Sequence, residues 1–281
     1  MTNKWILYLK ERFPAIPLFV FTLLVSISAE KYISNIISFK SLISGLIFLS
    51  FFLHLRLLDE FKDFEFDSNF HKDRPIQTGL IKLTDIKTLL FTNLLLMIFV
   101  SILTKYPLLF ALSLAYTLLM FKDFFVKNFF TKSPILYLIS HEIVFLLMYL
   151  YLFTFLSGKI YLSANLNEFL LFAYLLIPVI IIEIGRKMNH RYDHIGNKTT
   201  DTYSHIWGDF NTITVFFSLV AINVVALSII KNRLSIIILL IPCIIITILS
   251  LNNQFRNKIM QNHMKLTTLF ALVFPLLLLV I

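Results

Sequence analysis

The chain has few charged residues, few glycines and a single cysteine. Only 15% of its 281 residues are charged, whereas a water-soluble domain carries about 25%, so the chain lacks the polar surface of a soluble globule. Cys243 is the one cysteine, which excludes an intrachain disulfide. Six glycines are few for a transporter, whose spans are often broken by glycine and proline.

Long apolar runs take the place of charge. Hydrophobic residues make up 58% of the chain, and its mean hydropathy is +0.83. A helix needs about 20 apolar residues to cross a bilayer, and backbone groups in hydrocarbon must bond internally, which favours helices. The sequence therefore predicts an all-α membrane protein, one polytopic domain over residues 1–281 with nine transmembrane helices. The expected spans are 13–30, 41–58, 86–104, 106–121, 134–156, 168–185, 212–230, 234–251 and 265–281.

The positive charge is concentrated in alternate loops. The net charge of +9 would suggest a nucleic-acid partner in a soluble protein, but here 19 of the 25 Lys and Arg residues lie in loops 1–12, 56–87, 122–133, 186–210 and 252–265. Cytoplasmic loops carry such an excess. We therefore expect a cytoplasmic N-terminus, no nucleic-acid partner, and an integral multi-pass protein of a bacterial inner (plasma) membrane. The loops after the second and sixth spans then face the same side, the cytoplasm.

The loop after the second span carries regularly spaced acids. Asp59, Asp63 and Asp67 are four residues apart, and Glu60 follows the first. Residues at i and i+4 share a helix face, so we expect a row of carboxylates whose mutual repulsion a cation would relieve. A few carboxylates plus substrate phosphates are typical ligands of Mg²⁺. A solvated loop that only sets topology is the alternative interpretation.

A basic segment follows these acids. Arg74 precedes Pro75, and Gly79 lies shortly after. A guanidinium binds phosphate through two parallel hydrogen bonds, while proline and glycine favour a turn that would return the chain toward the acids. Carboxylates for Mg²⁺ followed closely by an arginine indicate a diphosphate site.

The order of these residues resembles the first aspartate-rich motif of the UbiA superfamily of intramembrane prenyltransferases. The matching pattern is Asp59-Glu60-x-x-Asp63-x-x-x-Asp67 followed by Asp73-Arg74-Pro75. Asp59 stands where that family usually has Asn, and Glu60 where it usually has Asp. The resemblance implies nine helices around a central cavity, with acidic motifs after the second and sixth helices.

A weaker match to the second motif of that family follows the sixth span. Glu183 ends the helix, Asn189 stands where an Asp is usual, and Asp193 and Asp201 follow. Asn189 lowers the charge available to a second Mg²⁺. His190 and His194 are also four residues apart, a spacing that zinc sites use, but no third ligand has a clear spacing, and ordinary loop histidines are the simpler interpretation.

Two polar positions lie inside the fifth span. An ionisable residue within a membrane indicates a functional site, so we expect His141 and Glu142 to line an acceptor pocket or relay a proton, or else to form a buried structural pair. Lys122, at the end of the fourth span, resembles the diphosphate-binding lysine of the family. A lysine that only sets topology is an equal alternative for it.

The resemblance implies a function as well as a fold. It implies Mg²⁺-dependent transfer of a prenyl group from a prenyl diphosphate to a hydrophobic acceptor, an aromatic one in the first instance, within the bilayer. The implied catalytic acids are Asp59, Asp63 and Asp67; the Mg²⁺ ligands are Asp59, Glu60, Asp63, Asp67 and Asp193; the diphosphate contacts are Arg74, Lys122 and Lys187; and the acceptor pocket contains Tyr116, His141, Glu142 and Glu183.

Other classes of membrane protein fit less well. CDP-alcohol phosphotransferases are identified by a D-G-x-x-A-R pattern, and no acidic residue of this chain begins such a pattern. A non-catalytic or transport protein of the same nine-helix architecture is the alternative to a prenyltransferase. Pyrophosphate release that depends on Mg²⁺ separates the two.

Overall fold

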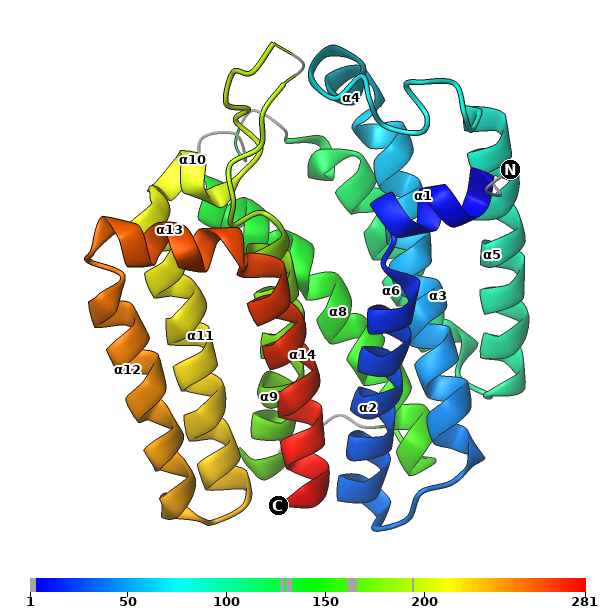
Figure 1. The fold of residues 1–281 in the computed structure, drawn as a ribbon. Coiled ribbons are helices and arrows are strands. Elements are labelled where there is room, and N and C mark those ends of the chain that lie inside the picture. Colours follow the sequence, from blue (N-terminus) through cyan, green and yellow to red (C-terminus); the bar gives the residue numbers. More distant parts are fainter. Residues whose placement is uncertain (1–3, 127–128, 130–132, 161–165, 194) are drawn as a thin grey trace. The chain divides into compact units, whose positions relative to one another are not determined.

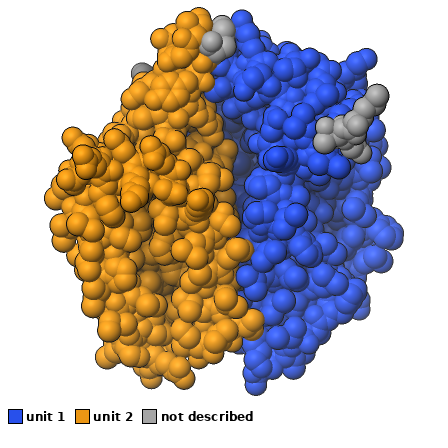
Figure 2. All heavy atoms as spheres, viewed as in Figure 1, with its two compact units in different colours: residues 1–161 blue, residues 162–281 orange. Residues whose placement is uncertain are grey.

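The computed structural model describes residues 4–126, 129, 133–160, 166–193 and 195–281, and the regular elements within them are helices. The chain divides into two compact units, unit 1 over Met1–Tyr161 and unit 2 over Leu162–Ile281, which Figure 2 colours separately. Each unit is described by itself. The expectation of one domain over the whole chain stays a prediction.

Unit 1 is built around the helix that ends in the acidic segment. That helix, α3 (Phe39–Lys62), packs against α2, α5 and α8, and α6 packs against α8 (Figure 1). The large apolar side chains Phe48, Phe51 and Tyr149 are fully buried in this bundle. The other elements of unit 1 are α1 (Lys4–Arg12), α2 (Ala15–Ser34), α4 (Phe64–Phe70), α5 (Leu83–Leu103), α6 (Pro107–Phe121), η1 (Asp123–Phe125) and α8 (Pro134–Ser157).

In unit 2 the central helices are α9 (Leu166–Arg186) and α11 (Asp209–Ile230). α9 packs against α11 and α14, and α11 packs against α12. α9 and α14 approach closely at Gly185, where an added Cβ would lie 1.8 Å from Oγ1 of Thr267, so only glycine fits there. The other elements are α10 (Tyr203–Trp207), η2 (Leu234–Leu239), α12 (Leu240–Leu249), α13 (Asn253–Gln261) and α14 (His263–Val280).

The helices confirm an integral, multi-pass membrane protein. Among the described residues, seven helices are long and apolar enough to cross a bilayer, and a bent pair made of 234–249 and 253–261 brings the number to as many as eight. The helix in the expected fourth span, α6, has 15 residues. At 1.5 Å per residue it is about 22 Å long, shorter than the hydrocarbon core of about 30 Å. The count of nine spans, the cytoplasmic N-terminus and the central cavity therefore stay predictions.

A short helix ahead of the first span is fixed against the end of α3. Tyr8 of α1 is fully buried in a cluster with Leu57 of α3 and with Ile76, Ile81 and Ile86. Burial of an aromatic side chain of this size is worth about 1.5–3 kcal/mol. Figure 1 shows α1 lying beside α3 and the start of α5. This docking carries the last residue of α1 to the acidic segment.

Candidate functional site

The acidic segment is helical on both sides of a break at Asp63. α3 ends at Lys62, α4 begins at Phe64, and Asp63 between them has φ −94° and ψ 4°. The backbone N–H of Asp63 still bonds to the carbonyl of Asp59 at 2.9 Å, and that of Asp67 to Asp63 at 2.8 Å. The spacing that the sequence predicted is therefore kept through the break.

The three aspartates of this segment do not share one environment. The side chain of Asp59 is 40% exposed and Asp63 is exposed, whereas the side chain of Asp67 is 2% exposed. The break turns Asp67 into the protein, and the expected single row of carboxylates is split into two exposed acids and one buried acid.

Glu60 is buried and surrounded by donors. Its carboxylate lies 3.0 and 3.3 Å from Nε and Nη2 of Arg12 and 2.6 Å from Nη2 of Arg56, and the hydroxyl of Tyr8 donates to it at 3.2 Å. A buried carboxylate is tolerated only when it is paired and hydrogen-bonded in this way. Burial, together with the negative charge of Glu60, raises the pKa of Tyr8, so this phenol remains a proton donor.

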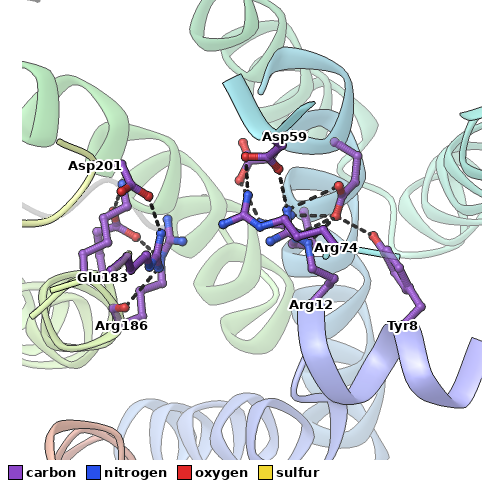
Figure 3. A network of polar contacts seen from close by, with 12 residues as sticks. Tyr8, Arg12, Asp59, Arg74, Glu183, Arg186 and Asp201 are labelled. Carbon is purple, nitrogen blue, oxygen red and sulfur yellow. Dashed lines mark hydrogen bonds and ion pairs between the residues drawn. The ribbon is translucent and has the colours of Figure 1, made fainter. Parts of the chain in front are cut away.

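Asp67 joins this group through the same arginine. Nη2 of Arg12 lies 3.2 Å from Oδ2 of Asp67, and Oδ1 of Asp67 contacts Nη1 of Arg74. Figure 3 shows Arg12 and Arg74 converging on these acids, with Tyr8 at the edge. We call the side chains of Tyr8, Arg12, Arg56, Glu60, Asp67 and Arg74 the arginine–carboxylate network.

Lys62 holds the turn after α6, a role the sequence did not suggest. Its Nζ lies 2.6 Å from Oδ1 of Asp123 and donates to the carbonyl of Met120 at 3.0 Å and the hydroxyl of Tyr137 at 3.2 Å. Three consecutive residues of this turn have positive φ, at 47°, 53° and 60° for residues 123–125. Non-glycine residues in this region cost about 1–3 kcal/mol each, so the contacts of Lys62 stabilise a strained segment.

The predicted diphosphate lysine of unit 1 lies in the same turn. Lys122 is exposed, and its Nζ lies 5.4 Å from the ring centre of Phe121. This position suits an anion approaching from water and equally suits a residue that sets topology.

Part of the predicted acceptor pocket lies next to the acids. His141 and Asp59 line the same small cavity of about 30 Å³, between α3, α6 and α8, which has room for one or two water molecules. Tyr116 donates to the carbonyl of Ser140 at 2.7 Å, and Glu142 is buried with 8% of its surface exposed. The structure thus brings together a predicted metal ligand and a predicted acceptor residue that are far apart in the sequence.

In unit 2 the end of α9 forms a second polar cluster, which Figure 3 also shows. Glu183 contacts Nε of Arg186 and lies 2.9 Å from Nζ of Lys187. Lys187 also lies 5.7 Å from the ring centre of Tyr203, whose N–H bonds to the carbonyl of Lys187 at 3.0 Å. Glu183 is therefore neutralised by neighbouring cations, and Lys187 is held at the start of α10.

The predicted metal ligand of unit 2 stabilises its own loop. Oδ1 of Asp193 accepts hydrogen bonds from the N–H groups of Ile195 at 2.9 Å and Asn197 at 2.8 Å. Further along, Arg191 pairs with Asp201 at 2.7 Å. Asp193 thus shapes the loop that the second motif resemblance covers.

The histidines of this loop do not form a zinc site within the described residues. Nε2 of His190 lies 2.9 Å from Oδ1 of Asp209, and His194 lies outside the described residues. Asn189 and His190 line a polar cavity of about 240 Å³ together with Tyr192, Lys198, Asp209, Asn257, Met260 and Gln261. Ordinary loop histidines stay the simpler interpretation.

Two exposed acids of the acidic segment could serve as ligands of a magnesium ion whose other ligands come from substrate. No group of three His, Cys, Asp or Glu side chains that could hold an ion occurs in the part of the chain that the structure describes. Glu60 and Asp67 face guanidinium groups, and Asp59 lies 3.9 Å from Nη1 of Arg56. Mg²⁺ is usually bound through one or two carboxylates plus substrate phosphates. The exposed acids Asp59 and Asp63 offer such hard oxygen donors.

Comparison with known proteins gives a match in fold and none in sequence. No family model and no curated protein matches the sequence. The fold is similar to the solved structure of a digeranylgeranylglyceryl phosphate synthase, with a TM-score of 0.53 and 18% sequence identity over 97% of this chain and 98% of that chain. That synthase acts in membranes. The resemblance that the acidic motifs indicated is confirmed at the level of the fold, because this chain has the same fold as that synthase.

Proposed function

We propose that the protein is a prenyltransferase that moves a prenyl group from a prenyl diphosphate to a hydrophobic acceptor within the bilayer, with Mg²⁺ as cofactor. The observation that carries this proposal is the guanidinium of Arg74, held by buried Asp67 in the segment that also presents Asp59 and Asp63. A fixed guanidinium next to exposed acids suits a diphosphate that carries a divalent ion. The similarity in fold to a membrane prenyltransferase supports the same conclusion.

The chain's own groups would bind and orient the diphosphate. Arg74 offers a planar fork of donors, while Lys122 and Lys187 offer point charges. Mg²⁺ held by Asp59 and Asp63 in unit 1 would supply positive charge that stabilises the leaving diphosphate, and Asp193 is the ligand proposed in unit 2. Glu60 and Asp67, which the motif also implies as ligands, contribute in this proposal by holding Arg12, Arg56 and Arg74 in place.

The reaction breaks the bond between the allylic carbon and the diphosphate oxygen. Both electrons of that bond leave with the diphosphate, and the arginine and lysine side chains stabilise the charge that develops there. An electron-rich atom of the acceptor then forms a bond to the allylic carbon, and the acceptor loses a proton. An aromatic ring is the first acceptor class we propose, and a glyceryl group, as in the name of the structural relative, is the second.

A non-catalytic binding protein is the second candidate. It is favoured by one observation: within the described residues no three-ligand metal group is formed, and two motif acids face arginines. Such a protein would bind prenyl diphosphate without breaking it. Product formation therefore separates the two candidates, and binding alone does not.

Pyrophosphate release by the full-length protein in lipid nanodiscs tests the proposal. Farnesyl and geranylgeranyl diphosphates are supplied with a membrane lipid extract as the acceptor source, with Mg²⁺ or with EDTA. We expect release that needs both Mg²⁺ and the extract, and mass spectrometry of the product then identifies the acceptor class. Binding of the diphosphate without release under any condition would overturn catalysis and support the non-catalytic candidate.

A matched pair of variants ties the activity to the acidic segment. Asp63→Asn should lower turnover about 100-fold, the scale of losing one group that stabilises transition-state charge, without lowering the unfolding temperature. Glu65→Gln removes an exposed carboxylate two residues away and should leave turnover within about twofold. Near-normal turnover of Asp63→Asn would exclude this residue as a metal ligand.

A further inference from the structure

We propose that Arg12 is a positioning residue of the acidic site, whose guanidinium takes the place of a metal cation between Glu60 and Asp67. In unit 1 a divalent ion is then bound through Asp59 and Asp63 alone. This inference rests on the proposed function, since it concerns how the same site holds its metal and its diphosphate. Arg12 lies outside both acidic motifs, in the short helix ahead of the first span.

The first argument is geometric. Arg12 forms two hydrogen bonds to Glu60, at 3.0 and 3.3 Å, and one to Asp67 at 3.2 Å. The side chains of Arg12, Glu60 and Asp67 are 10%, 1% and 2% exposed. A bridging cation between two buried carboxylates is what a metal ion would provide, and here a side chain that is always charged provides it.

The second argument is that Arg12 is a permanent part of the site. Its helix is anchored by the fully buried ring of Tyr8 and by the ion pair of Lys4 with Asp85 at 2.8 Å. The residue after it, Phe13, is also buried, at 4% exposure. A guanidinium held from both sides in this way stays between the acids whether or not substrate is bound.

The third argument concerns charge. Arg12, Arg56 and Arg74 face two buried carboxylates, Glu60 and Asp67, and Arg56 also lies 3.9 Å from the partly exposed Asp59. At the buried pair itself, three guanidinium groups surround two carboxylates, an arrangement that favours a diphosphate nearby and disfavours a metal ion between Glu60 and Asp67. Asp67 contacts both Arg12 and Arg74. Arg12 partly neutralises this carboxylate, so Asp67 competes less strongly with a bound anion for the guanidinium of Arg74.

Metal and donor binding by the full-length protein test this role without relying on turnover. The protein is placed in phosphatidylcholine nanodiscs, Mn²⁺ binding is counted by electron paramagnetic resonance, and farnesyl thiodiphosphate serves as an unreactive donor analogue. The variants are Arg12→Gln, Arg12→Lys and the double variant Arg12→Gln with Glu60→Gln. Lys10→Gln, which removes an exposed charge from the same helix, is the matched control.

Arg12→Gln should bind Mn²⁺ about tenfold more tightly, or bind one more ion per chain, because the buried acids regain negative charge. It should bind the analogue about tenfold more weakly, which corresponds to about 1.4 kcal/mol. The Mn²⁺ and analogue affinities of Arg12→Lys should lie between those of wild type and Arg12→Gln, because lysine keeps the positive charge and loses the bidentate contact. The double variant should return Mn²⁺ binding toward the wild type while analogue binding stays weak.

If Arg12→Gln changes neither binding more than Lys10→Gln does, the proposal is overturned while the proposed function stands. If Arg12→Gln does not fold, the other two variants decide: wild-type behaviour of both overturns the proposal. A wild-type protein that binds neither Mn²⁺ nor the analogue would overturn the proposed function, and this inference with it.

Discussion

Arg12 and Glu60 form a two-armed ion pair across 48 positions of the chain, with Nε 3.0 Å from Oε1 and Nη2 3.3 Å from Oε2. One residue ends the helix before the first span, and the other lies in the last turn of α3. Removing one partner of a buried pair leaves an uncompensated charge. Glu60 is therefore a structural residue in addition to being part of the motif.

Glu60→Gln and Asp59→Asn should differ in their effect on stability. Glu60→Gln should lower the free energy of unfolding by about 3–5 kcal/mol, because Arg12 and Arg56 lose their shared buried partner. The side chain of Asp59 is 40% exposed, so Asp59→Asn should change the free energy of unfolding by less than about 0.5 kcal/mol. This variant should nevertheless lose turnover. Thermal unfolding in one detergent, alongside pyrophosphate release, makes the comparison. Equal loss of stability in the two variants would contradict it.

Arg74→Ala should weaken binding of the diphosphate more than binding of the acceptor. The guanidinium contacts Asp67 and, in our proposal, the phosphate oxygens, so we expect the affinity for farnesyl thiodiphosphate to fall about 10- to 100-fold, or about 1.4–2.8 kcal/mol. The Michaelis constant for the acceptor should change less than about twofold. Arg74→Lys should recover only part of the loss, since lysine cannot form the two-armed contact. Equal losses for donor and acceptor would make Arg74 a structural residue.

Sequence reasoning succeeded where a local pattern determines the structure. Apolar runs of the right length predicted helices, and helices occupy those positions, including α3 and α9 with their acidic ends. The motif around Asp63 and Arg74 predicted a fold that the structural relative confirms. Arg56 had a local signal too, since it lies four residues before Glu60, the spacing of helical ion pairs.

Sequence reasoning did not predict contacts between segments that are far apart in the chain. Nothing near Arg12 in the sequence indicates that it bridges Glu60 and Asp67, because a charged residue before a first span is also what topology requires. Lys62 likewise read as a loop charge, although it holds the turn at Asp123. Composition reports which segments enter the membrane and carries no information on which charges meet at its boundary.

Lys62→Met should loosen the turn after α6. The substitution removes the partner of Asp123 at 2.6 Å and the donors to Met120 and Tyr137, so the strained backbone of 123–125 loses its support. Amide hydrogen exchange in 120–126 should speed up by about tenfold or more. The control is Lys87→Met, an exposed lysine of α5, which should leave that exchange unchanged. An unchanged rate in Lys62→Met would show that the turn is held by other contacts.

Asp193→Asn and Asp193→Ala separate the two roles that this residue has in our account. Asn keeps an oxygen that accepts the N–H groups of Ile195 and Asn197, so the loop should resist trypsin as in the wild type, whereas Ala removes both bonds and should expose Lys198 to cleavage. If Asp193 is a metal ligand, both variants should raise the Mg²⁺ concentration for half-maximal turnover about tenfold, because both lose the negative charge. Loss of a residue that only supports a metal ligand typically costs about 10- to 100-fold in metal affinity or activity, and loss of the ligand itself should cost at least as much. If only the Ala variant changes the Mg²⁺ requirement, the effect follows the loop, and Asp193 acts by shaping the segment that joins α9 to α10 and not by binding the ion.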